Sequence, residues 1–190
     1  MVGFDAFGFT KKCDPKSSIG RLQRVFRGRS EGATFRMLAV VASFGRWPRP
    51  AVLLFVAYLS HLAEEWFGGF PAWTRAVLGN GVSAERFALV NGIGLLLFAT
   101  LTLVALRSPS MVWFYTSFAA LTGINGVLHA LATLAFGRYS PGTITGLLLY
   151  LPLSVIVLGA TSSRLSGPVF AISVLGGMLF HGFVTFMALQ

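Results

Sequence analysis

The chain has 190 residues, of which 55% are hydrophobic and only 11% are charged. A water-soluble domain carries about 25% charged residues, so this composition excludes that class and indicates an integral membrane protein. The formal net charge of +9 raises the question of nucleic-acid binding, but most basic residues are crowded into one tail beside the first apolar segment. Attraction to anionic lipid explains such a tail, and no nucleic-acid partner is expected.

Residues 1–36 form this basic tail, which is rich in Gly, Ser, Lys and Arg and which we expect to be disordered and cytoplasmic. The segment 35–44 (FRMLAVVASF) is apolar but too short to cross a bilayer, so it predicts an interfacial helix. Met37 offers an alternative start of the chain. Cys13 is the only cysteine, which excludes a disulfide framework and a thiolate metal site. Residues 37–190 are therefore expected to form a membrane-embedded domain.

Long apolar segments separated by short polar breaks predict about five transmembrane helices, and hence an all-α polytopic membrane helix bundle. The breaks at 107–110 and 161–168 are short and contain proline, as in tight connections between antiparallel helices. The longer break at 68–86 contains GGFPAW and GNG, and we expect it to be a loop folded over the membrane surface. The expected spans are roughly Ala51 to Phe67, Phe87 to Leu106, Met111 to Phe136, Thr143 to Ala160 and Pro168 to Leu189.

The distribution of basic residues predicts the orientation, because Lys and Arg in short loops are retained on the cytoplasmic side. Ten of the fifteen precede residue 50. With a cytoplasmic N-terminus and five crossings, Arg107 and Arg164 also lie inside, which leaves three arginines outside and a division of twelve to three. We therefore expect the C-terminus to lie outside.

The apolar spans contain every histidine of the chain and an adjacent pair of glutamates. His61, Glu64 and Glu65 are spaced i, i+3 and i+4, so all three project from one face of the first span. His129 and His181 fall at a similar depth in the third and fifth spans, in the outer half of the bilayer. Ionisable groups inside a span are costly and rarely lack a partner. One divalent metal ion, either zinc or iron or manganese, would satisfy all of them together.

A simpler interpretation of the glutamates is that they extend to water at the outer interface or pair with one of the three outer arginines. Asn125 lies four residues before His129, so it suits a partner that orients that imidazole. Asparagine in a span is about as often a hydrogen-bonding link between helices. Asn91, about one turn inside the second span, is closer to that linking role than to chemistry.

Three motifs follow one another along the chain: HLAEE at 61–65, NGVLH ending at His129, and YSPG at 139–142. Together they resemble the marks of the HXXEE-domain family of integral membrane proteins, which has no settled activity, and the similarity covers roughly residues 50–190. The resemblance implies that His61, Glu64, Glu65, His129 and the YSPG turn, with Tyr139 in a supporting position, are the marked residues. His181 is added to this set from its depth alone.

These residue types indicate a metalloenzyme of the membrane. A free carboxylate beside a metal-bound water is what general-base hydrolysis needs, but the spacing does not decide which of Glu64 and Glu65 is the ligand and which the base. Two carboxylates are too few for a di-iron carboxylate site, so one metal is expected. The leading hypothesis is hydrolysis of a lipid or other apolar substrate, with iron-dependent oxidation second. A proton- or cation-coupled carrier and a non-enzymatic scaffold without metal are the alternatives.

Overall fold

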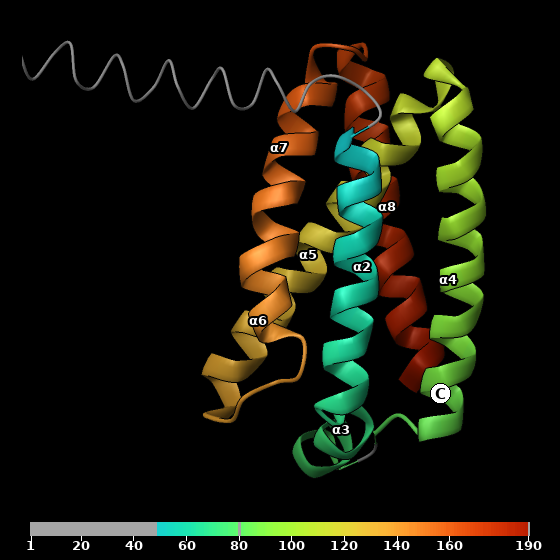
Figure 1. Ribbon diagram of the computed structural model, residues 1–190. Helices are drawn as coiled ribbons and strands as arrows, with labels where there is room; N and C mark the ends of the chain where they lie inside the picture. Colours follow the sequence, from blue (N-terminus) through green and yellow to red (C-terminus); the bar gives the residue numbers. More distant parts are fainter. Residues whose placement is uncertain (1–48, 80, 190) are drawn as a thin grey trace, which may run out of the picture. The chain divides into compact units, whose positions relative to one another are not determined.

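The computed structural model describes residues 49–79 and 81–189. The expected basic tail at 1–36 and the expected interfacial helix at 35–44 both lie outside the described residues. Every regular element within the described ranges is helical, and the predicted all-α membrane bundle is confirmed. Figure 1 shows the long helices running side by side, with α3, α6 and the C-terminal end of the chain gathered at the same end of the bundle.

The chain order of the elements follows the predicted spans with small shifts at the ends. A 3-10 turn, η1, precedes α5, and a π-helical turn, η2, joins α6 to α7, so α6, η2 and α7 make one continuous helix from Thr143 to Ser162. The elements are α2 (Arg49–Phe67), α3 (Phe70–Leu78), α4 (Ala84–Arg107), η1 (Pro109–Met111), α5 (Val112–Phe136), α6 (Thr143–Thr145), η2 (Gly146–Tyr150), α7 (Leu151–Ser162) and α8 (Gly167–Leu189).

Within the part of the chain that the structure describes, four helices are long and apolar enough to cross a membrane, and they match the second to fifth predicted spans: Ala84–Arg107, Val112–Phe136, Thr143–Ser162 and Gly167–Leu189. The first predicted span is helical throughout as α2, which packs against α4 and α7. It is not among the four, because His61, Glu64 and Glu65 make its second half polar. The count of about five is therefore approximate, and α2 is the helix in question.

The break at 68–86, expected to be a loop, contains the helix α3. Gly69 precedes it in the left-handed conformation (φ 74°), and Pro71 lies in its first turn, where a missing amide proton costs no hydrogen bond. The prediction was wrong because nine residues carry a weak periodic signal and because Gly and Pro, interpreted there as loop residues, mark the start of this helix instead.

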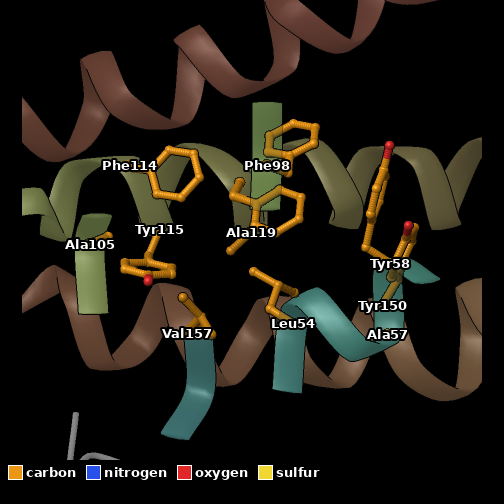
Figure 2. Packing of buried hydrophobic residues seen from close by; sticks show 11 residues of the cluster. Leu54, Ala57, Tyr58, Phe98, Ala105, Phe114, Tyr115, Ala119, Tyr150 and Val157 are labelled. Carbon is orange, nitrogen blue, oxygen red and sulfur yellow. The ribbon is translucent and has the colours of Figure 1, made fainter. Parts of the chain in front are cut away.

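The buried core lies where α2, α4, α5, η2 and α7 meet. Phe98 of α4 stacks on Phe118 of α5 with ring centroids 4.3 Å apart, and Tyr115 is fully buried and donates to the Thr102 carbonyl. Figure 2 shows Tyr58 and Tyr150 together at one end of this cluster. These two tyrosines also line a cavity, so the packed core ends where the cavity begins.

Close backbone packing joins α5 to η2. A Cβ added to Gly126 would lie 2.9 Å from the carbonyl oxygen of Gly146, and one added to Gly146 would lie 3.0 Å from Gly126 Cα. The absence of side chains at both positions therefore lets the two backbones touch. His129 follows Gly126 by about one helical turn, so this contact brings its imidazole next to the segment that precedes η2.

Candidate metal centre

Three buried side chains from α2 and α5 converge at one end of the bundle. His61, Glu65 and His129 each offer one ligand atom, and these atoms all lie within 4.8 Å of one another. Glu65 Oε1 lies 3.5 Å from His61 Nε2 and 3.1 Å from His129 Nε2. The exposed fractions are 2%, 6% and 6% for His61, Glu65 and His129. Two imidazole nitrogens and a carboxylate oxygen thus face one another away from water, which is a donor set for a divalent metal.

The protonation of His61 follows from its neighbour Thr145. The Thr145 hydroxyl has a single proton, which it donates to Glu64 Oε2 at 2.5 Å. At His61 Nδ1, 2.8 Å away, the same oxygen must therefore act as acceptor, so Nδ1 carries the ring proton. The opposite nitrogen, Nε2, then has a free lone pair when the imidazole is neutral, and that buried atom has no hydrogen-bond partner among the described residues. A lone pair that faces a carboxylate oxygen calls for a cation between them.

His129 is held in the same way by a hydroxyl on the other side of its ring. Its Nδ1 lies 3.0 Å from Ser140 Oγ. Ser140 is 1% exposed and is itself anchored, because its backbone amide donates to Thr133 Oγ1 at 3.0 Å. Each histidine therefore has its Nδ1 on a threonine or serine hydroxyl and its Nε2 directed at Glu65, the arrangement in which an outer partner orients an imidazole ligand.

Glu64 has a different role from its neighbour Glu65. Its Oε1 accepts from the Tyr139 hydroxyl. It also accepts from the backbone amides of Gly142 and Ile144, both at 3.0 Å. Its Oε2 accepts from the Thr145 amide at 2.7 Å and from the Thr145 hydroxyl. Five donors from the turn before α6 and from its first residues thus occupy one carboxylate. Glu64 therefore anchors both the turn that supplies Ser140 and the helix α6 that supplies Thr145 to the histidines, and it lies outside the group of candidate ligands.

Tyr139 is well suited to this donor role. Its partial burial, together with its hydrogen bond to the Glu64 carboxylate, raises the pKa of the Tyr139 phenol to about 12. The phenol therefore stays protonated over the whole physiological range and continues to donate to Glu64. Tyr139 was expected in a supporting position, and the structure places its hydroxyl on Glu64, the neighbour of the candidate ligand Glu65.

Gly142 is the point of closest approach between the turn and the histidines. Its φ of 105° is in the left-handed region, and an added Cβ would lie 2.8 Å from Cε1 of both His61 and His129. Any side chain here would strain the backbone and collide with both imidazoles. The glycine of the YSPG motif therefore makes room for the candidate metal centre.

The remaining expected site residues lie near this centre without joining its ligand atoms. Asn125 Nδ2 is 3.1 Å from His181 Nε2, so Asn125 contacts His181 rather than the expected His129. Asn91 donates to the Phe87 carbonyl of its own helix at 3.0 Å. His181 is therefore outside the three-residue group, and neither asparagine orients a candidate ligand.

An apolar cavity of about 570 Å³ adjoins the centre. His61, Glu65, His129, His181 and Asn125 are among its lining residues, and most of the others are apolar side chains of α3, α4, α5 and α8. All three histidines thus line one cavity, as their similar depth predicted. Among residues 49–79 and 81–189, the partners of Glu65 are His61 and His129, and those of Glu64 are donors at 139–145, whereas the simpler interpretation expected arginines.

Sequence reasoning missed Thr145, which holds His61, and the tyrosine that stacks on His61, and it marked Ser140 only as part of the YSPG turn, without its role on His129. Tyr150 lies 4.3 Å from His61 between ring centroids. The signal available was the hydroxyl-rich stretch YSPGTIT, since imidazole ligands commonly need an outer hydrogen-bond acceptor.

Of the comparisons with known proteins, the one with protein families gave a match. The search of curated proteins and the search of solved structures each gave no match. A family described as "protein of unknown function with HXXEE motif" matches residues 52–157, a range that contains His61, Glu64, Glu65, His129 and the YSPG turn. The matched range covers more than half of the chain, and the chain therefore belongs to this HXXEE family.

Proposed function

We propose that the protein is a metal-dependent membrane enzyme that hydrolyses a lipid or another apolar substrate, with one divalent metal held by His61, Glu65 and His129. The observation that carries the proposal is the convergence of these three ligand atoms within 4.8 Å on the wall of an apolar cavity. Two histidines and one carboxylate leave at least one position open on a four-coordinate metal, as catalytic sites require.

The metal would act as a Lewis acid that polarises an ester carbonyl and lowers the pKa of water. Side chains of the protein would provide the ligands and the proton transfer. Glu65 serves as the anionic ligand, and Glu64 is excluded as a base because hydrogen-bond donors occupy both of its oxygens. His181 lines the same cavity; its Nε2 accepts from Asn125 and would exchange that partner for the attacking water, whose proton it would accept and return to the leaving alcohol. One ester bond breaks, and water supplies the hydroxyl of the acid and the proton of the alcohol.

Iron-dependent oxidation is a second candidate, favoured by the composition of the ligand set. Two histidines and one carboxylate with open positions are the ligands of non-haem iron oxygenases. Such chemistry uses molecular oxygen and needs no carboxylate base, which fits the full occupation of Glu64. The two candidates differ in the source of the oxygen atom that enters the product.

Elemental analysis of the full chain purified in mild detergent tests the proposal. We expect about one zinc, iron or manganese per chain in the wild type and little in Glu65→Gln or His129→Ala. Glu85→Gln is the matched control, since Glu85 is exposed at the first turn of α4, and it should keep the metal. A wild-type protein that is folded yet binds no divalent metal would contradict the proposal and favour the scaffold.

The reaction is tested with membrane lipid extracts incubated with metal-loaded protein in labelled water or under labelled oxygen. Label from water in a newly released carboxylic acid supports hydrolysis, and label from oxygen gas in a product supports oxidation. Glu65→Gln protein provides the background. Metal-dependent cation uptake into proteoliposomes without any lipid product would instead identify a carrier.

A further inference from the structure

The cavity beside the candidate metal centre has a wall that is open within the predicted membrane spans. Ile93 and Leu97 of α4 and Phe183 and Met187 of α8 line the cavity, and all four side chains are exposed. Both helices are candidate membrane spans. A cavity whose exposed lining is apolar and lies within the spans opens toward lipid, so a ligand would enter between α4 and α8 from the bilayer.

The polar end of the cavity contains an unused hydrogen-bond acceptor. Asn125 Nδ2 donates to His181 Nε2, which leaves Asn125 Oδ1 buried without a partner among the described residues. Asn125 is one turn before His129 on α5, and both side chains line the cavity. A buried acceptor without a donor is costly, so a ligand in the cavity whose O–H group reaches this atom, with a shift of the side chains that cover it, would remove that cost.

The cavity size limits the ligand further. A volume of about 570 Å³ is in the range of pockets that hold one small ligand, and it is too small for a two-chain membrane lipid with its headgroup. Most of the lining residues are apolar, and the polar ones include Asn125, Glu65 and the three histidines. These features together select a molecule with a single apolar chain and one polar end.

We propose that the substrate is a single-chain lipid ester with a free hydroxyl on its headgroup, which enters between α4 and α8 and donates that hydroxyl to Asn125 Oδ1. The assignment of this molecule as substrate rests on the proposed function, whereas its binding does not require the metal. Asn125 is then the residue that selects the headgroup, and the ester lies next to His61, Glu65 and His129.

Binding is measured with the full chain in detergent after metal removal by EDTA, so that no turnover interferes. The probes are monopalmitoylglycerol, which has free hydroxyls, and methyl palmitate, which has the same acyl chain and none. We expect wild-type protein to bind monopalmitoylglycerol about tenfold more tightly, because one hydrogen bond to a buried acceptor is gained. Equal affinities, or tighter binding of methyl palmitate, would overturn the proposal.

Two pairs of variants assign the effect to the residues named. Asn125→Leu should bind methyl palmitate as the wild type does and lose the preference for monopalmitoylglycerol. If Asn125→Leu binds neither ester, Asn125→Ala, which also lacks an acceptor, takes its place and must show the same loss, since retention of the preference in either variant refutes the role of Asn125. Ile93→Trp should weaken binding of both esters by obstructing the entrance. Leu96→Trp, also exposed on α4 but outside the cavity lining, should not, and equal effects of the two would refute the entrance.

The outcome is separable from that of the proposed function. If the protein discriminates between the esters but binds no metal, the proposed lipid site is supported and the proposed metalloenzyme is refuted. If the protein binds metal through His61, Glu65 and His129 but has equal affinities for the two esters, the metal centre is supported and the proposed substrate class is refuted.

Discussion

Replacement of Glu64 by glutamine tests whether this carboxylate sets the protonation of His61 through Thr145. The amide keeps the shape of the side chain but has an acceptor on one side only. If its oxygen stays at the Oε1 position, it keeps Tyr139, Gly142 and Ile144 as donors, and its NH2 group then faces the amide and hydroxyl of Thr145. The hydrogen bond from the Thr145 amide is lost and the one with the Thr145 hydroxyl is reversed, because the NH2 group donates to it. The free energy of unfolding should therefore fall by about 1–3 kcal/mol.

The consequence for the metal is distinct from this loss of stability. Without an acceptor at Glu64, the Thr145 hydroxyl is free to donate to His61 Nδ1, which moves the ring proton to Nε2 and removes the lone pair needed for ligation. Metal affinity in Glu64→Gln should therefore fall by about 10–100-fold, the usual effect of losing an outer partner, whereas Glu65→Gln should lose binding altogether.

The assay is a metal titration against a competing chelator, combined with thermal unfolding in the same detergent. Thr145→Val should reproduce the loss of affinity, and Thr145→Ser, which keeps the hydroxyl, should restore most of it. Wild-type affinity in Glu64→Gln would refute the link through Thr145. Complete loss of metal from folded Glu64→Gln protein would show instead that Glu64 is a ligand.

Three further outcomes are expected. Gly142→Ala should destabilise the protein and abolish metal binding, because its Cβ would lie 2.8 Å from both imidazoles. Gly137→Ala, with φ of 60° and nothing within 4 Å, should cost only about 1 kcal/mol of unfolding free energy and keep the metal. Equal metal loss in both variants would contradict the steric argument. His181→Ala should keep the metal and lose turnover, as measured by elemental analysis and product formation, and loss of metal would place His181 among the ligands. A reporter enzyme fused after Gln190 should be active on the non-cytoplasmic side, as the twelve-to-three division of basic residues predicts, and a cytoplasmic reporter would mean an even number of crossings.

The helices were predictable because apolar length is a direct requirement of the bilayer and leaves a strong signal in the chain. The helix α3 could not be predicted, since Gly69 and Pro71 at its start are residue types that are equally common in loops. The position of all three histidines beside one cavity could be inferred from their depth in the predicted spans, because residues at equal depth in antiparallel helices lie at the same level of the bilayer.

The separate roles of Glu64 and Glu65 could not be predicted from their positions. At i+3 and i+4 from His61, both project from one helical face, and only the fold shows that Glu64 meets the turn before α6 while Glu65 meets His129. The donors of that turn lie at least 75 residues along the chain from Glu64, and no local pattern reports such a pairing. For the same reason the sequence could not reveal that Asn125 bonds to His181 rather than to His129.

The division of the cavity between two groups of helices has a consequence for how such a protein could diversify. The candidate ligands come from α2 and α5 and are braced by the turn before α6, whereas α4 and α8 provide much of the remaining lining. Exchange of apolar side chains on α4 and α8 would change the shape of the bound chain without displacing a ligand atom. The candidate ligands and much of the apolar lining thus lie on different helices, so the apolar lining residues of α4 and α8 can be redesigned while the ligand atoms of α2 and α5 stay in place.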